Sequence, residues 1–387
     1  MRRLKIGLFI DTFFPMVDGV VMVVDNYARR LTKYADVTVF APSVPRKSYD
    51  DSTLPYKVVR CKSMPVPFLD YSLPVPNIDS NFKKELKNSN LDIVHIHSPF
   101  TIGKIALKYA KKNNIPIIAT MHSQYKQDFK RAVKLEFLAN MLTKNLIKVF
   151  DECTDCWAVN NEVAKIFYEE YGYKELPYVQ NNATDMMIIE IGEEADKEIN
   201  EKYSISSDEK VFLFVGRINI LKNILFIADA LKIVKDDGYK FKMLFVGNGQ
   251  DEEKLKEKIQ ELNLNNDVIL CGRVTDRELM KKIYARADLF LFPSLYDASS
   301  LVQIEAASQK TPTIFIEGSA TSATVSNNVN GVIAKNDVQD YAKAIEKLIT
   351  DNDFYKVVSE GAYRDLYKNW DDKVKEVYEK YTSYIEE

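Results

Sequence analysis

The sequence predicts an α/β protein of two doubly wound domains that face each other across a cleft. Short apolar runs alternate with longer amphipathic segments along the whole chain, which is the pattern of strand–helix repeats. The apolar runs are continuous rather than alternating, as expected for parallel strands that are covered on both faces. The 387 residues correspond to two domains at roughly 100–200 residues per domain.

Strands are expected at the apolar runs on both sides of a boundary near residue 185. They are KIGLFI (5–10), VTVFAP (37–42), DIVHIH (92–97), PIIATM (116–121), CWAV (156–159), VFLFVG (211–216), KMLFVG (242–247), DVILCG (267–272), DLFLFP (288–293), PTIFIE (312–317) and GVIA (331–334). A turn cluster at 182–185 and the charged segment after it mark the boundary. We therefore expect one domain over 1–185, a second over 186–367, and a final helix at about 368–387 that packs back on the first domain.

Composition excludes several classes of protein. A hydrophobic fraction of 46% excludes a mainly disordered chain, and a net charge of −3 argues against nucleic-acid binding. Four cysteines are too few for a disulfide scaffold, and the lone pair Cys153 and Cys156 is expected in the core. No apolar run approaches the roughly 18 residues of a membrane span, and the first one ends at Asp11, too early for a signal peptide. A cytoplasmic protein is therefore expected.

Charge is unevenly distributed along the chain. Residues 1–185 have a net charge of +6, and the remainder has a net charge of −9. A basic half favours contact with an anionic partner, and a solvated surface without a partner is the alternative.

One basic segment, 126–149, has apolar residues at helical spacing. We expect it to form a helix on an anionic membrane surface, so that the protein is peripheral on the inner face of the membrane. A helix packed on its own domain is the alternative. The apolar stripe is Phe129, Val133, Phe137 and Met141, and the cations are Lys126, Lys130, Arg131, Lys134, Lys144 and Lys148.

The first candidate site follows the strand VFLFVG. Arg217 leaves the strand tip, and Lys222 lies five residues later, near the start of the next helix. Two cations beside a helix N-terminus can bind phosphate, Arg in a bidentate manner and Lys as a point charge. Two solvated surface cations are the alternative.

The second candidate site follows the strand DLFLFP. Asp297 lies in the loop, and Ser299 or Ser300 is expected to cap the following helix. The helix start offers free N–H groups to an anion, and carboxylates can accept hydrogen bonds from sugar hydroxyls. Glu305 lies inside the apolar helix LVQIEAA and therefore needs a partner.

All three histidines, His95, His97 and His122, lie near strand ends. His95 and His97 share one strand face, so a three-histidine zinc site is conceivable. Hydrogen-bonded pocket residues are the favoured interpretation, because the carboxylates that orient such ligands are not evident.

These residues resemble a known family. Arg217 with Lys222, then an acidic residue, seven residues and Glu305, is similar to the donor-site signature of the retaining GT-B glycosyltransferases of family GT4. The resemblance extends over nearly the whole chain and implies two Rossmann-like domains. The segments HIHSPF and SLVQIEAASQKTP most resemble those of bacterial enzymes that glycosylate diacylglycerol lipids.

The resemblance implies a role for each matching residue of the second domain. Arg217 and Lys222 would neutralise the donor diphosphate, and Ser300 and Leu301 would offer it backbone N–H groups. Glu305 would bind the ribose hydroxyls. Asp297 would contact the transferred sugar.

Two further roles fall in the first domain. Gly19 would let the backbone approach the diphosphate, and His122 matches the family's active-site histidine. The chain departs from the family pattern where Asp297 replaces a glutamate, where ASSLV replaces a Gly-Phe-Gly run, and where Asp18 stands in place of a first glycine. Asp18 is expected to point away from the donor.

No metal cofactor is expected. The adjacent pairs Asp50–Asp51, Asp236–Asp237 and Asp371–Asp372 lack the Asp-x-Asp spacing of metal-dependent transferases. Arg217, Lys222 and helix N-termini would stabilise the leaving diphosphate instead. The family implies attack on the same face of the sugar, with the departing phosphate accepting the acceptor's proton.

The expected activity is transfer of a hexose, glucose from UDP-glucose, to a membrane glycerolipid such as diacylglycerol. The partners are thus a UDP-sugar, a lipid or saccharide acceptor and an anionic membrane, with no nucleic acid. A cell-envelope or capsular saccharide acceptor, a non-catalytic accessory subunit and a nucleotide-sugar 2-epimerase are the alternatives.

Overall fold

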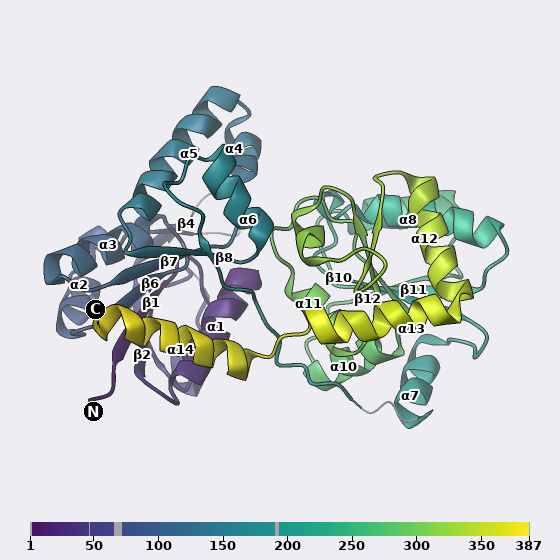
Figure 1. Ribbon diagram of the computed structural model, residues 1–387, viewed down its shortest axis with the longest axis horizontal. Coiled ribbons are helices and arrows are strands. Elements are labelled where there is room, and N and C mark those ends of the chain that lie inside the picture. The colour runs from purple at the N-terminus through teal and green to yellow at the C-terminus, as the bar shows by residue number, and fades with distance from the viewer. Residues whose placement is uncertain (1, 46, 66–71, 190–192, 387) are drawn as a thin grey trace. The chain divides into compact units, whose positions relative to one another are not determined.

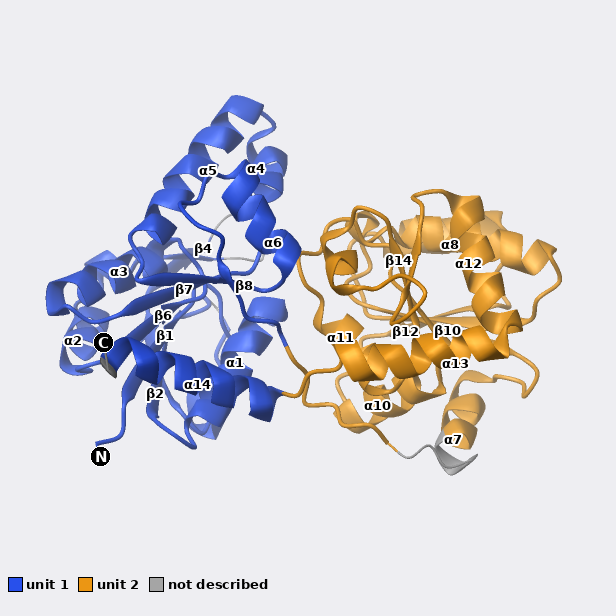
Figure 2. Ribbon diagram, in the orientation of Figure 1, with its two compact units in different colours: residues 1–182, 370–387 blue, residues 183–369 orange. Residues whose placement is uncertain are grey.

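The computed structural model describes residues 2–45, 47–65, 72–189 and 193–386. The chain divides into two compact units, shown in Figure 2. Unit 1 comprises residues 1–182 and 370–387, and unit 2 comprises residues 183–369. The last helix begins at Trp370 and belongs to unit 1.

Unit 1 is built on a parallel sheet in the order β3-β2-β1-β6-β7-β8-β9. Its strands are β1 (Lys5–Phe9), β2 (Asp36–Pro42), β3 (Lys57–Cys61), β6 (Ile93–Ile96), β7 (Ile117–Met121), β8 (Asp155–Ala158) and β9 (Tyr178–Val179). A separate antiparallel pair is formed by β4 (Ser63–Pro65) and β5 (Ser72–Pro74).

Some helices of unit 1 begin at a polar residue whose side chain caps the first turn. The helices of this unit are α1 (Gly19–Leu31), α2 (Ser80–Asn88), α3 (Thr101–Asn113), α4 (Tyr125–Val133), α5 (Glu136–Asp151), α6 (Asn161–Lys165) and α14 (Trp370–Glu386). Asp18 caps α1 by accepting from the Val21 N–H, and Asp79 caps α2 in the same way. Helix α14 packs against α1, as Figure 1 shows.

The single helix predicted over 126–149 is wrong. The segment forms two helices, α4 and α5, because Lys134 adopts a left-handed conformation with a φ of 52° and ends the first helix. Leu135 then precedes the first turn of α5.

Unit 2 is built on a second parallel sheet in the order β12-β11-β10-β13-β14-β15. Its strands are β10 (Lys210–Val215), β11 (Phe241–Val246), β12 (Val268–Gly272), β13 (Leu289–Leu291), β14 (Thr313–Ile316) and β15 (Val332–Ala334). Its helices are α7 (Glu193–Tyr203), α8 (Ile224–Asp236), α9 (Glu252–Glu261), α10 (Arg277–Arg286), α11 (Leu301–Ser308), α12 (Val338–Thr350) and α13 (Asn352–Gly361).

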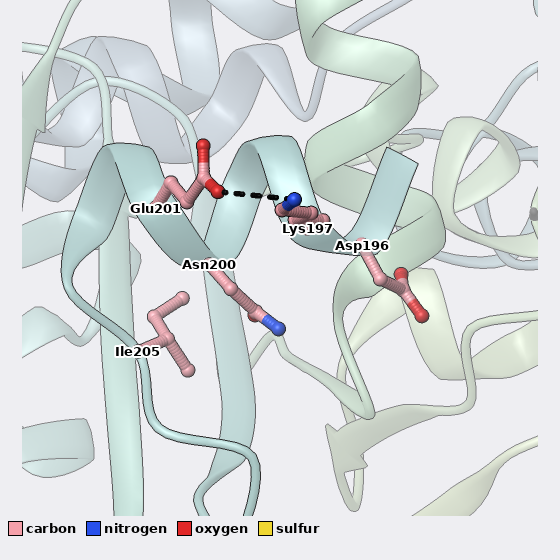
Figure 3. A pocket seen from close by; sticks show the side chains of 5 residues that line it. All are labelled: Asp196, Lys197, Asn200, Glu201 and Ile205. Carbon is pink, nitrogen blue, oxygen red and sulfur yellow. Dashed lines mark ion pairs between the residues drawn. The ribbon is translucent and has the colours of Figure 1, made fainter. Parts of the chain in front are cut away.

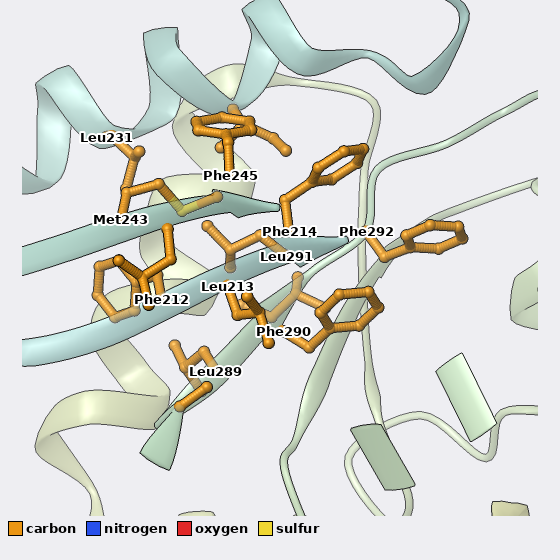
Figure 4. Close-up of a cluster of buried hydrophobic side chains, with 14 of the residues drawn as sticks. Phe212, Leu213, Phe214, Leu231, Met243, Phe245, Leu289, Phe290, Leu291 and Phe292 are labelled. Atoms are coloured by element: carbon orange, nitrogen blue, oxygen red, sulfur yellow. The ribbon is translucent and has the colours of Figure 1, made fainter. Parts of the chain in front are cut away.

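The core of unit 2 explains the continuous apolar runs of its strands. Side chains from β10, β11 and β13, among them Phe212, Phe245 and Phe290, are completely buried (Figure 4). Leu231 of α8 packs into the same cluster. Strands that are covered in this way require apolar residues at successive positions, which confirms the predicted doubly wound class for this unit.

Both sheets reverse their strand order at one point. In unit 1 the reversal lies between β1 and β6, and in unit 2 it lies between β10 and β13. In open α/β sheets, ligands bind beyond the carboxyl ends of the two strands at this point. The segments that follow β1, β6, β10 and β13 are therefore the places where a functional site is expected.

Candidate active site

The loop after β10 carries Arg217 on a glycine-dependent turn. A Cβ atom at Gly247, which follows β11, would lie 1.9 Å from the carbonyl oxygen of Gly216. Only glycine allows the two loops to approach so closely. Arg217 is exposed, and no described residue hydrogen-bonds to it or forms an ion pair with it. Its guanidinium is therefore available to an anion.

Lys222 is held at the end of a single 3-10 turn, Ile220–Lys222, that precedes α8. Asn219 caps this turn by accepting from the Lys222 N–H at 3.2 Å, and Asp251 accepts from the Ile220 N–H at 3.0 Å. Asn223 donates to the Pro293 carbonyl at 3.3 Å and so ties the turn to the end of β13. These bonds fix the backbone of the turn from which the Lys222 side chain extends.

The loop after β13 places Asp297 against Lys222. The two side chains form an ion pair, and each is about one-sixth exposed. The Lys222 ammonium also lies 5.9 Å from the centre of the Phe292 ring. The other carboxylate oxygen of Asp297, Oδ2, is buried and has no hydrogen-bond partner among the described residues. A buried acceptor without a partner is costly unless a ligand supplies a donor.

Helix α11 begins directly after this loop. Ser300 is its N-cap residue, as predicted, although the Ser300 side chain makes no capping hydrogen bond. Ser299 is half-buried, and Leu301 is the first helical residue. The N–H groups of the first turn are those that lack intrahelical partners.

Glu305 has the partners that its place in an apolar helix requires. The Arg277 guanidinium donates to Oε1 at 2.8 Å, and the Tyr284 hydroxyl donates to Oε2 at 3.0 Å. Arg277 also pairs with Asp185. Burial raises the pKa of the Glu305 carboxyl, and the Arg277 guanidinium acts against this rise. The sequence indicated the need for a partner, but both partners lie on α10, more than 20 residues earlier.

In unit 1, Gly19 opens α1 after the loop that follows β1. A Cβ at Gly19 would meet no atom within 4 Å, so this glycine is not required by packing within unit 1. The Asp18 carboxylate is engaged in capping α1. The space at Gly19 is therefore free of the unit's own side chains.

His122 follows β7 and belongs to a buried polar cluster. Its Nε2 lies 3.0 Å from Nδ1 of His97, which follows β6. His95 of β6 is bonded to the Thr120 hydroxyl at 2.7 Å and to the Tyr381 hydroxyl of α14. Burial lowers the pKa of His122 to about 3, so the imidazole is neutral at physiological pH. The interpretation as hydrogen-bonded pocket residues therefore agrees with the contacts.

The described residues contain no group of three or more His, Cys, Asp or Glu side chains that could hold a metal ion. The sequence does contain one Asp-x-Asp spacing, at Asp351–Asp353, so this spacing does not by itself argue against a metal. Asp351 uses its carboxylate to cap α13, where it accepts from the Phe354 N–H at 3.0 Å. Cys153 and Cys156 are buried free thiols, as predicted.

Two hollows on the surface of the described residues lie elsewhere. The larger, of about 380 Å³, is lined by Asp196, Lys197, Asn200, Glu201 and Ile205 (Figure 3). A second, of about 210 Å³, lies in unit 1 at the amino ends of β1, β2 and β3. None of the residues predicted for the site lines either hollow.

Within unit 2 the structure brings Lys222 and Asp297 into contact, but it does not place Arg217 or Glu305 in that ion pair. Gly19 and His122 belong to unit 1, where Gly19 follows β1 and His122 follows β7, with β6 between these two strands. In the part of the chain that the structure describes, no helix is both long and apolar enough to cross a bilayer.

Comparison with known proteins agrees with this arrangement. The family description "Glycosyltransferase Family 4" matches residues 17–186, and "Glycosyl transferases group 1" matches residues 195–365. An alpha-monoglucosyldiacylglycerol synthase of Streptococcus pneumoniae is 27% identical, covering 97% of this chain and 85% of that protein. One from Acholeplasma laidlawii is 24% identical, covering 85% of this chain and 84% of that protein.

Solved structures show the same fold. HepE of Anabaena, in complex with UDP and glucose, has a TM-score of 0.78 at 14% identity, covering 98% of this chain and all of that one. Sucrose-phosphate synthase of Thermosynechococcus elongatus has a TM-score of 0.81 at 18% identity, covering 98% of this chain and 99% of that one. With its two parallel sheets, the chain is of the GT-B class. It belongs to glycosyltransferase family 4, which is a retaining family.

Proposed function

We propose that this protein transfers glucose from UDP-glucose, with retention of configuration, to a membrane glycerolipid such as diacylglycerol. The observation that carries the donor half of the proposal is the pairing of Lys222 with Asp297 at the strand-order reversal, close in sequence to the unpaired Arg217. The acceptor half is supported by the two diacylglycerol-lipid synthases among the relatives and by a basic, partly apolar surface on unit 1.

In this proposal unit 2 binds the nucleotide sugar. Arg217 and Lys222 bind the diphosphate, and the N–H groups near Ser300 and Leu301 contribute further hydrogen bonds. Their fixed positive charge stabilises the diphosphate as it departs, which lowers the barrier without rearrangement of solvent. Glu305 accepts hydrogen bonds from the ribose hydroxyls.

Asp297 has two consecutive roles in this scheme. Without donor, it neutralises Lys222 and keeps the ammonium in place. When the diphosphate arrives, Lys222 turns to the phosphate oxygens, which carry more charge than one carboxylate. Asp297 is then free to accept a hydroxyl of the transferred sugar, and its unpartnered Oδ2 atom already requires such a donor.

In the proposal, unit 1 binds the acceptor and also contributes His122 and Gly19 to the reaction. A neutral His122 can donate or accept one hydrogen bond at the sugar, and its bond to His97 restricts the ring orientation. The missing side chain at Gly19 leaves room for the donor diphosphate to approach the start of α1.

Nucleotide sugars test the donor assignment directly. UDP-glucose is expected to raise the melting temperature of the protein more than GDP-mannose or ADP-glucose, because a ligand of the folded state stabilises it by mass action. With dioleoylglycerol in mixed micelles, UDP-glucose should yield an α-linked glucolipid, and excess EDTA should leave the rate unchanged.

Other outcomes of that experiment identify the alternatives. If glucose were transferred to a saccharide but not to the lipid, the acceptor would be a saccharide and the lipid assignment would be wrong. Release of UDP without any acceptor would indicate an epimerase, and binding without turnover would indicate an accessory subunit. Loss of activity in EDTA that Mg²⁺ restores would contradict the role given to Arg217 and Lys222.

The proposed membrane-binding surface lies on α4 and α5. Leu135, Phe137 and Met141 are 60%, 78% and 44% exposed, which is unusual for large apolar side chains. Exposed cations lie on the same two helices and the break between them, and Lys130 and Arg131 pair there with Glu136 and Asp128. The cations are Lys130, Arg131, Lys134, Lys144 and Lys148. Apolar side chains that enter the acyl boundary, with cations at the level of the headgroups, are typical of an interfacial helix. The break at Lys134 leaves Leu135 and Phe137 near the turn between the helices.

A charge-neutralising variant tests this surface. Replacing Lys130, Arg131 and Lys134 with alanine is expected to weaken binding to anionic vesicles by about 100-fold, at about 1 kcal/mol per basic residue. Sedimentation with phosphatidylglycerol vesicles measures this. The matched control replaces Lys83, Lys84 and Lys87, three exposed lysines of α2, and should bind as the wild type does. If the variant on α4 and the control variant on α2 bind the vesicles equally well, α4 and α5 do not form the membrane contact.

A further inference from the structure

Three residues of unit 2 form a hydrogen-bonded cluster with Glu305, the second acidic residue of the site. Both carboxylate oxygens of Glu305 accept a hydrogen bond, from Arg277 on one side and from Tyr284 on the other. Arg277 is bound in turn by Asp185. The two donors lie on α10 at positions 277 and 284, seven residues apart and so two turns apart on one side of the helix.

The segment that carries Asp185 is itself fixed. The Thr184 N–H donates to the Lys368 carbonyl at 2.8 Å, and Thr184 pairs with Asn369 as an isolated β-bridge. These two segments are the places where the chain enters unit 2 and leaves it again. Arg277 thus connects the boundary of the unit with the interior carboxylate of Glu305.

We propose that Arg277 and Tyr284 are positioning residues that orient the Glu305 carboxylate for the two hydroxyls of the donor's ribose. The inference rests on the proposed function, in which Glu305 accepts those hydroxyls. Arg277 and Tyr284, which lie outside the motif of Asp297, seven residues and Glu305, would thus help the protein to distinguish ribonucleotides from deoxyribonucleotides. Asp185 would hold the Arg277 guanidinium in place.

The geometry supports this role in two ways. A carboxylate offers about four lone-pair sites, and Arg277 and Tyr284 occupy one on each oxygen, so one site on each oxygen stays open for a ribose hydroxyl. The side chain of Glu305 is only 11% exposed, so without a cation beside it the carboxylate would favour its neutral form. A neutral carboxyl accepts hydroxyl hydrogen bonds more weakly than a carboxylate does.

The test compares nucleotides that differ only in the ribose hydroxyls. Wild-type protein is titrated calorimetrically with UDP and with 2′,3′-dideoxy-UDP, and with the corresponding guanosine pair. The wild type should prefer UDP by about tenfold or more, because a hydrogen bond to a charged group contributes about 1.5–3 kcal/mol. R277M should reduce this preference to about twofold, by weakening UDP binding and leaving dideoxy-UDP binding unchanged.

Three further variants separate positioning from a general structural role. R277K should recover part of the preference because it restores the charge without the bidentate geometry. E305Q should abolish the preference, and R277M combined with E305Q should be no worse than E305Q alone. The matched control is K282M, because Lys282 lies on the same helix and pairs with Glu198 instead.

The outcomes are distinguishable. A wild type that binds both nucleotides equally would refute the ribose role of Glu305 and, with it, this inference. A wild type that prefers UDP while R277M keeps the same preference would overturn the inference alone. If R277M weakened the binding of both nucleotides equally, the inference would also be overturned, because Arg277 would then have a structural role only. Tyr284→Phe, which removes one hydroxyl, gives the same comparison if R277M does not fold.

Discussion

An Arg217→Ala variant is expected to lose about 10²–10³-fold in kcat while unit 2 remains as stable as in the wild type. The guanidinium is exposed and makes no bond to any described residue, so its removal leaves no buried group without a partner. In the proposed reaction, however, it stabilises the diphosphate charge that develops as the sugar departs. A large catalytic effect with no cost in stability is the signature of a residue whose partner is a ligand.

The measurement combines steady-state kinetics with thermal unfolding of the same samples. Lys240→Ala is the matched control: Lys240 is an exposed cation next to the amino end of β11, where it pairs with Asp208. That variant should retain wild-type turnover. Lys222→Ala should lose a similar factor in kcat, and its melting temperature should also fall, because the partly buried Asp297 loses its counter-ion. Wild-type turnover in Arg217→Ala would contradict the donor site proposed for unit 2.

Acid is expected to destabilise unit 1 between pH 6.5 and pH 5, above the pH at which most carboxylates titrate. All three histidines are buried in unit 1, and burial lowers the pKa of each, to about 3 for His122. The unfolded chain binds protons at these histidines near pH 6.5, whereas the folded unit does not. Stability is therefore complete above pH 6.5 and falls as the pH decreases, by about 2 kcal/mol per histidine at pH 5, or about 6 kcal/mol in total.

Tryptophan fluorescence follows this transition selectively. The only two tryptophans of the sequence, Trp157 and Trp370, are both buried in unit 1. The urea midpoint of their fluorescence should fall steeply between pH 7 and pH 5. Asp11 acts in the opposite direction, because burial raises its pKa, but it is a single group against three. A midpoint that is the same at pH 7 and pH 5 would contradict the buried, neutral state of the histidines.

Much of the fold could be predicted because its central strands are covered on both faces. Each of the predicted runs lies at a strand, since burial on two sides requires an uninterrupted apolar sequence. β3 was not predicted, because Lys57 and Arg60 interrupt its apolar residues at the edge of the sheet. β9 has only two residues and gives no pattern. The break between α4 and α5 depends on one left-handed residue, Lys134, which no apolar spacing reveals.

Residues of the site could be predicted where they follow the end of a strand, but their contacts with distant parts of the chain could not. Lys222 and Asp297 could each be assigned to the site in advance because each follows a strand at the expected edge of the sheet, but their ion pair was not predicted. Tyr381 contacts His95 across 286 residues of sequence, and Arg277 reaches Glu305 from another helix. Such contacts depend on how helices pack on the sheet, and this packing leaves no spacing signal in the chain. The need for a partner at Glu305 was predictable, and its identity was not.

Unit 1 is assembled from two stretches of sequence that are separated by all of unit 2. During synthesis the ribosome delivers the 187 residues of unit 2 before α14, a delay of roughly 10–40 s at about 5–20 residues per second. Throughout that interval the nascent first unit lacks Tyr381 and Trp370, and the apolar surfaces of Tyr27 and Trp157 that they cover remain open to solvent. Unit 1 therefore stays incomplete until its last helix has been made, and during that interval its uncovered aromatic rings are open to aggregation.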